Sequence, residues 1–264
     1  MPGQSGRRMG ILGRWQAVAA AMLSCGVALF GVAADLRADP LGPSNVLQFS
    51  ASSDSRSEPF GPFVSVLSAG GVHEKWLEVE RRLGDERVQL ALCDGDRDRC
   101  VSPAALQLLA IVDRARARDG RARLGEINRA INLAIRPMSD LAQYGAIDVW
   151  NSPLVTFAHG AGDCEDYAIA KFVALRLAGI APDDLRIVIM HDTRRGEDHA
   201  VAAVRLDGHW LTLDNQHMAM VEDVDVRNYR PLFVIDDNSV MKYADAPLLA
   251  NLPGQPSTDP NGVF

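Results

Sequence analysis

The segment from Gly160 to Tyr167 (GAGDCEDY) concentrates residue types that nucleophilic catalysis uses. Two glycines approach Cys164, and an apolar pattern typical of a helix begins at this cysteine. The first turn of a helix has free N–H groups and partial positive charge, which favour a thiolate and can hold the oxyanion of an acyl-transfer intermediate. Asp163 is placed to cap the helix, and Asp166 completes a capping-box-like pair. Cys164 is therefore a candidate nucleophile.

Three carboxylates flank this cysteine, and their negative charge disfavours a thiolate. They belong to Asp163, Glu165 and Asp166. A nearby imidazolium or a bound cation must offset them. The competing interpretation of Cys164 is a buried, inert, small apolar residue, but its polar neighbours and its place at a helix start argue against the core.

A cysteine nucleophile needs a base within reach and a group that orients the base. His199 begins a predicted strand after a polar loop, so we expect it at the edge of the sheet. Asp214 closes the next strand, and neighbouring strands lie about 4.8 Å apart, so the two side chains could meet. The sequence therefore predicts a triad of Cys164, His199 and Asp214. The alternatives are an Asp214 that merely begins a turn, and the other histidines as bases: His159, His191, His209 and His217.

Three helices are expected before this segment. The first covers about 73–92, with a break at Gly84. Ser102 as an N-cap and Pro103 at the first helical position start the second. The third runs from about 121 to 135. All three segments have apolar residues at helical spacing. The sequence therefore predicts a run of three helices before the cysteine.

The pattern changes after the helix that carries the cysteine. Residues 138–162 are interpreted as a loop with local turns, and the cysteine helix runs from 164 to 178, with Gly179 placed to stop it. Alternation with period two then predicts strands over 185–190, 199–204, 210–214 and 232–235. Asp207-Gly208 predicts a hairpin. Helices followed by antiparallel strands indicate an α+β fold.

The first 34 residues have the pattern of a secretory signal peptide: arginines, then an uncharged apolar run, then Val32-Ala33-Ala34. A retained membrane anchor is the alternative, and Cys25 leaves a lipoprotein open. We expect a linker over 35–60, one domain over 61–240 and a flexible tail over 241–264. A signal peptide implies export, which predicts a periplasmic protein.

The charge balance argues against nucleic-acid binding. Removal of the leader's three arginines takes the 27 basic residues to 24 against 34 acidic ones, a net charge of −10. Such an acidic protein is a poor partner for nucleic acid or anionic membranes.

Cysteine spacing fits an oxidising compartment. Cys93 and Cys100 bracket a short polar loop, which predicts a disulfide. A zinc clip lacks further ligands nearby. The alternating aspartates of the loop are not in register with a calcium-binding EF-hand. Cys164 stays unpaired.

The chain resembles the bacterial transglutaminase-like cysteine proteinases, a family of LapG-like periplasmic proteases. The likeness covers roughly residues 60–236, and the run GDCEDYA with HAV and LDN downstream is highly specific. The matching residues are Asp148-Val-Trp150, Pro153, GDCEDYAIAK (162–171), Leu175, Gly179-Ile180, Leu185-Arg-Ile187, Asp198-His-Ala-Val201, Leu213-Asp-Asn215 and Tyr229-Arg-Pro231.

The resemblance implies a papain-like, transglutaminase-like core, in which the nucleophile helix packs on an antiparallel sheet, and a Cys-His-Asp triad at Cys164, His199 and Asp214. It also implies calcium beside the nucleophile, bound by acidic residues at the positions Asp163, Glu165, Asp166 and Asp183. Calcium prefers several oxygen ligands. The alternative is a capped helix N-terminus without metal.

The implied activity is an endopeptidase that cleaves a large surface adhesin at a di-alanine site, in the setting of a biofilm. A membrane-bound cyclic-di-GMP receptor is an implied partner. A transglutaminase or amidase would use the same acyl-enzyme, and a calcium-dependent binding module is the non-enzymatic alternative. An intact Cys, His and Asp set argues against the binding module.

Overall fold

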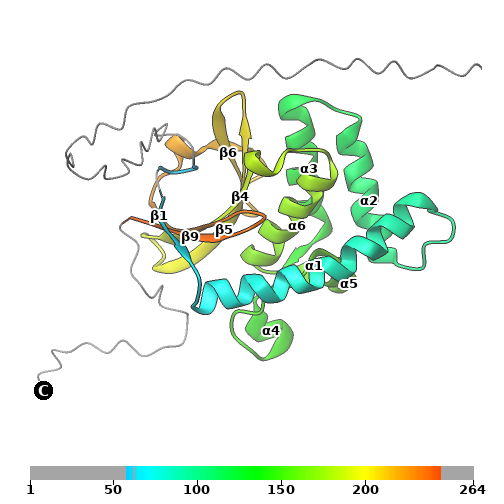
Figure 1. Cartoon of the computed structure of the whole chain (residues 1–264), viewed down its shortest axis with the longest axis horizontal. Helices are drawn as coiled ribbons and strands as arrows, with labels where there is room; N and C mark the ends of the chain where they lie inside the picture. Colours follow the sequence, from blue (N-terminus) through cyan, green and yellow to red (C-terminus); the bar gives the residue numbers. More distant parts are fainter. Residues whose placement is uncertain (1–57, 62, 245–264) are drawn as a thin grey trace, which may run out of the picture. The chain divides into compact units, whose positions relative to one another are not determined.

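The computed structural model describes residues 58–61 and 63–244 (Figure 1). The N-terminal part consists of the helices α1 (Gly71–Gly95), α2 (Pro103–Arg116) and α3 (Gly120–Ala134). Ser102 caps α2 as predicted, because its side chain accepts a hydrogen bond of 3.2 Å from the Ala105 N–H.

The predicted break at Gly84 is wrong, because α1 is continuous through this residue. A glycine inside a helix costs about 1 kcal/mol relative to alanine. Val79 and Leu83, which α1 buries in the core beside it, supply more than that. Tertiary packing therefore outweighs the local propensity.

The interpretation of 138–162 as a loop is also wrong. This segment contains α4 (Asp140–Tyr144), α5 (Pro153–His159) and β3 (Ala161–Gly162), which pairs in parallel with β2 (Arg136–Pro137). The buried Glu86 of α1 accepts hydrogen bonds of 3.1 and 3.2 Å from the Leu154 N–H and so caps α5. A cap from another helix leaves no signal in the local sequence.

The cysteine helix is α6 (Cys164–Leu177), and Gly179, at a φ of 91°, follows its end. A short 3-10 helix, η1 (Pro182–Asp184), leads into the strands β4 (Leu185–Asp192), β5 (Glu197–Leu206) and β6 (His209–Leu213). The predicted hairpin is confirmed: β5 and β6 pair antiparallel, and both turn residues, Asp207 and Gly208, have positive φ.

Four further strands complete a seven-stranded sheet whose pairings are all antiparallel, in the order β1-β9-β8-β4-β5-β6-β7. They are β1 (Phe63–Leu67), β7 (Val221–Glu222), β8 (Tyr229–Ile235) and β9 (Val240–Tyr243), with η2 (Asp223–Asp225) after β7. The sequence predicted only β8 among these four. The α+β fold class is confirmed.

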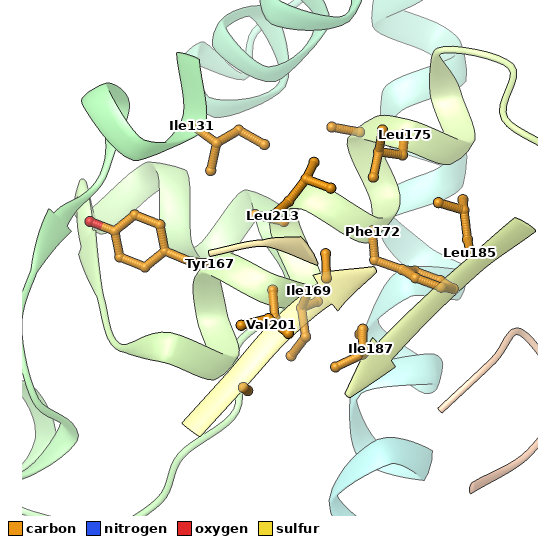
Figure 2. Packing of buried hydrophobic residues seen from close by; sticks show 14 of the residues in the cluster. Ile131, Tyr167, Ile169, Phe172, Leu175, Leu185, Ile187, Val201 and Leu213 are labelled. Atoms are coloured by element: carbon orange, nitrogen blue, oxygen red, sulfur yellow. The ribbon is translucent and has the colours of Figure 1, made fainter. Parts of the chain in front are cut away.

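The helix α6 lies between the sheet and the other helices (Figure 1). Figure 2 shows Ile169 and Phe172 of α6 among strand residues such as Ile187 of β4. Because α6 is buried on several sides, the position of its first residue is fixed by the core of the domain.

The predicted disulfide between Cys93 and Cys100 is present and ties the end of α1 to the start of α2. The predicted leader and nearly all of the predicted linker and tail lie outside the described residues. Within 58–61 and 63–244, no helix is long and apolar enough to cross a membrane.

Candidate active site

Cys164 occupies the first position of α6, with Asp163 at the N-cap position. The predicted capping box is wrong, because the Asp163 side chain makes no capping hydrogen bond. Asp166 instead accepts hydrogen bonds from Asn151, 2.9 Å from its backbone nitrogen and 3.2 Å from its amide nitrogen. The first N–H groups of α6 therefore have no side-chain cap from Asp163.

The thiol of Cys164 is half-buried and donates a hydrogen bond of 2.9 Å to Oε2 of Glu165. Burial raises the pKa of this thiol well above its usual value, and the negative charge of Glu165 raises it further. The Ala200 backbone, in β5, lowers the pKa of the thiol. Ala200 directly follows His199 in this strand.

His199 is 4% exposed, and its Nε2 lies 2.9 Å from Oδ1 of Asp214. Burial alone would raise the pKa of Asp214, but the hydrogen bond and charge of His199 and the Gln216 N–H hold it below the usual range. The expected place at the edge of the sheet is wrong in one respect: β5 is an interior strand, and His199 pairs with Met190 near its start.

Asp214 also serves a second imidazole. Nδ1 of the exposed His217 lies 3.2 Å from Oδ2 of Asp214. The ring of Tyr229 lies 5.9 Å from that of His199, measured between centroids. The other three candidate bases contact different groups: His159 contacts Tyr144, His191 contacts Asp198, and His209 contacts Glu222.

An acidic cluster lies at the start of α6. Carboxylate oxygens of Asp140, Asp163 and Asp166 all lie within 4.8 Å of one another. Burial raises the pKa of Asp163 to about 9, and the charges of Glu165 and Asp166 raise it as well. Burial also raises the pKa of Asp166 to about 7, against the hydrogen bonds from Asn151. Ionised carboxylates are thus costly here unless a cation joins them.

The donor set fits a cation. Oδ1 of Asp140 and Oδ1 of Asp163 are buried without a hydrogen-bond partner. Lys75, whose ammonium feels the charges of these residues, pairs with Asp148 instead. Hard divalent cations such as calcium prefer carboxylate oxygens. This acidic group could hold a metal ion.

The structure brings together two of the four predicted metal-binding residues, Asp163 and Asp166, in this group. Glu165 is adjacent, with its carboxylate on the Cys164 thiol. Asp183 lies in η1, beyond the opposite end of α6, and its carbonyl accepts a hydrogen bond from Arg186. Asp183 is therefore not part of the acidic group.

Sequence reasoning missed Asp140. It starts the short helix α4 inside the segment that was interpreted as a loop. Its carboxylate accepts a hydrogen bond from the Val149 N–H. Only a Ser-Asp pair marks this position in the sequence, and such a pair is typical of any helix start.

A cleft of about 240 Å³ begins beside Asp214. The buried residues Met190, Val201 and Thr212 line it, as does Tyr229, whose ring lies next to that of His199. Apolar walls with a few polar groups are typical of a site for a ligand side chain.

A cysteine at a helix N-terminus beside a buried His-Asp pair, on an antiparallel sheet, defines a papain-like or transglutaminase-like class of enzyme. The chain belongs to the bacterial transglutaminase-like cysteine proteinases, whose family profile matches residues 90–238. It is therefore a cysteine protease, and its substrate is a protein.

The chain is similar to two solved forms of LapG from Legionella pneumophila. One is 22% identical, with a TM-score of 0.47, and the match covers 53% of this chain and 77% of the other. The calcium-bound form is also 22% identical, with a TM-score of 0.47, over 56% and 85%. A transglutaminase structure is 12% identical, with a TM-score of 0.34, over 49% and 37%. No curated protein matches the chain.

Proposed function

We propose that this protein is an exported cysteine endopeptidase with Cys164 as nucleophile, His199 as base and Asp214 as the group that orients the base. The 2.9 Å contact between His199 and Asp214 carries this proposal, together with the neighbouring Ala200, whose backbone lowers the pKa of the Cys164 thiol. The contact uses Nε2 and leaves Nδ1 of the imidazole for proton transfer.

Catalysis then follows from these groups. His199 takes the thiol proton as the Cys164 sulfur attacks the scissile carbonyl. Free N–H groups at the start of α6, that of Cys164 among them, stabilise the oxyanion. His199 returns the proton to the leaving amine, and a thioester to Cys164 remains. Water, activated by His199, hydrolyses the thioester and restores the thiol. Asp214 stabilises the imidazolium in both steps.

We propose calcium as the cation of the acidic group, held by Asp140, Asp163 and Asp166, with Glu165 adjacent. The two orphaned, buried oxygens support this, as does the existence of a calcium-bound form of a similar protein. A bound divalent cation would supply positive charge that offsets the carboxylates around Cys164. Asp183 remains a proposed further ligand only by resemblance.

The wider setting is proposed from the resemblance to LapG-like proteases. The protein is placed in the periplasm, exported by a signal peptide over 1–34. A linker precedes the peptidase domain and a tail follows it, and the domain extends beyond the predicted bounds of 61 and 240, because Glu58 pairs with Arg186 and β9 continues to Tyr243. The substrate is a large surface adhesin with a di-alanine site, so the activity affects biofilm formation, and a membrane-bound cyclic-di-GMP receptor is the partner.

The test is to incubate the purified protein with a di-alanine-containing N-terminal fragment of an adhesin, with calcium or with EGTA. Cleavage that requires both calcium and Cys164 supports protease, metal and nucleophile together. Cleavage by Cys164→Ala at the wild-type rate would remove the nucleophile assignment. Incorporation of an added amine, with no cleaved peptide, would show that the enzyme is a transamidase.

A further inference from the structure

The backbone that carries Asp214 is held by side chains from two helices. Nζ of Lys171 in α6 lies 3.1 Å from the carbonyl oxygen of Leu213. Nδ2 of Asn132 in α3 lies 2.9 Å from the carbonyl oxygen of Asp214. The two carbonyls on either side of the Asp214 nitrogen and Cα thus each accept a hydrogen bond from a helix.

The next carbonyls along the chain are held in the same way. Nδ2 of Asn132 also lies 3.2 Å from the oxygen of His217. Nδ2 of Asn128 lies 3.2 Å from the same oxygen and 3.1 Å from that of Met218. Four carbonyls between Leu213 and Met218 therefore accept hydrogen bonds from three side chains.

The donors on α3 are spaced as one face of a helix. Arg121, whose guanidinium lies 3.2 Å from the carbonyl oxygen of Met220, is followed by Asn128 and Asn132 at intervals of seven and four residues. The acceptors run in the opposite direction, from Met220 back to Asp214. This face of α3 lies along the segment after β6.

Burial of these polar donors costs free energy of folding, because they lose their contact with water. Asn128 and Lys171 are fully buried. Oδ1 of Asn128 and Oδ1 of Asn132 are buried without a partner, although both amide nitrogens are used. An apolar residue would avoid each unsatisfied oxygen but would remove the hydrogen bonds to these carbonyls, so the two asparagines hold this backbone segment at the cost of one buried oxygen each.

Lys171 is the most costly of the donors. Burial lowers the pKa of its ammonium to about 7, against the charge of Asp214, which raises it. Nζ also lies 5.7 Å from the centroid of the Tyr167 ring. Neutral and charged amines both donate hydrogen bonds, so the contact with Leu213 exists in either state.

We infer that Lys171 and Asn132 are positioning residues for Asp214: they fix its backbone from both sides, so that its carboxylate meets Nε2 of His199. The inference rests on the proposed triad. The side chain of Asp214 already has two imidazoles to serve, since Oδ2 contacts His217. A backbone free to turn would let the carboxylate follow the exposed His217 and leave His199.

The test uses the full chain without its leader and two readouts that need no substrate. The first is the ¹⁵N chemical shifts of the His199 ring at pH 8, which report whether Nε2 or Nδ1 carries the proton. The second is the rate of Cys164 alkylation by iodoacetamide. The variants are Asn132→Leu and Lys171→Met, with Asp214→Ala as reference and Arg129→Leu, on the exposed side of α3, as matched control.

We expect Asn132→Leu and Lys171→Met to shift the His199 ring toward a mixture of tautomers and to slow alkylation at least tenfold. Arg129→Leu should change neither the ring shifts nor the alkylation rate. Lys171→Arg, which keeps a donor, should retain part of the wild-type ring shifts and alkylation rate. Lys171→Met removes a buried amine and keeps a side chain of similar length, so we expect it to fold. It therefore provides the test if Asn132→Leu does not fold.

Wild-type ring shifts in both folded variants would overturn the inference, whatever their melting temperatures. Failure of the proposed triad is distinguishable: Asp214→Ala would then alkylate at the wild-type rate, while the ring shifts alone still decide whether Asn132 and Lys171 position Asp214.

Discussion

Asp140 and Asp163 meet at the start of α6, and each buries a carboxylate oxygen that has no hydrogen-bond partner. One comes from the short helix α4 and the other from the N-cap position of the cysteine helix. A cation between them would join these two segments and place its charge next to Cys164.

We therefore expect Asp140→Asn to weaken calcium binding at least tenfold, because the substitution removes one ionised ligand. Isothermal titration calorimetry measures this directly. Asp98→Asn, in the exposed disulfide loop, is the matched control and should bind as the wild type does. A weaker affinity for Asp183→Asn than for Asp140→Asn would instead favour the ligand set implied by the family resemblance.

The metal-free protein should lose stability as the pH rises. The folded-state pKa values of Asp163 and Asp166 are raised, to about 9 and about 7, so the folded protein binds more protons than the unfolded chain above pH 4. The contribution of these two carboxyls to the free energy of unfolding should fall progressively from about pH 4 to about pH 9, and above about pH 7 the buried Lys171 acts in the opposite direction. Calcium should flatten this dependence. Urea unfolding at several pH values, with calcium or EGTA, measures both curves.

Lys171→Met should stabilise the protein at neutral pH. The pKa of Lys171 is lowered to about 7, so the unfolded chain binds more protons between pH 7 and 10.5, and stability rises with pH across that interval. The full penalty, a few kcal/mol, applies below pH 7. The variant should lose that pH dependence, whereas Lys242→Met, at a less buried site, should keep it. An unchanged slope in Lys171→Met would contradict the prediction.

Gly162→Ala should disrupt the site without any strain in the backbone. A Cβ at this position would lie 2.5 Å from Oδ2 of Asp166 and 2.8 Å from its Cβ. Asp166 cannot move away without breaking its hydrogen bonds with Asn151. We therefore expect the free energy of unfolding to fall by about 1–3 kcal/mol, the usual cost of overpacking, and calcium binding to weaken. Gly84→Ala in α1 meets nothing within 4 Å and should gain up to about 1 kcal/mol. Thermal and chemical unfolding of the pair would separate the two effects.

The sequence predicted those parts of the fold and site whose signals are local. The start of α2 at Ser102 follows from its cap, and the β5–β6 hairpin follows from Asp207-Gly208. The contact of His199 with Asp214 was predicted from the β5–β6 hairpin, although Asp214 lies directly after β6 and not within it. These features depend on residues within one or two elements.

What the sequence could not predict depends on distant residues. The start of α5 is capped by Glu86, and Asp140 reaches the acidic group only through tertiary folding. The strand β7 has two residues, too few for alternation to be visible. The donors Asn128 and Asn132 look like ordinary polar positions of a helix, because their acceptors lie some 80 to 90 residues away.

The buried ion pair between Arg186 and Glu58 joins β4 to a residue that precedes the sheet, with Nε 2.6 Å from Oε2. The Tyr243 hydroxyl likewise donates to the Pro59 carbonyl. A buried guanidinium deprived of its carboxylate costs about 3–5 kcal/mol. The stretch just before β1 is thus an integral part of the catalytic domain. An enzyme truncated to begin at residue 61 would contain a buried Arg186 guanidinium without its carboxylate partner.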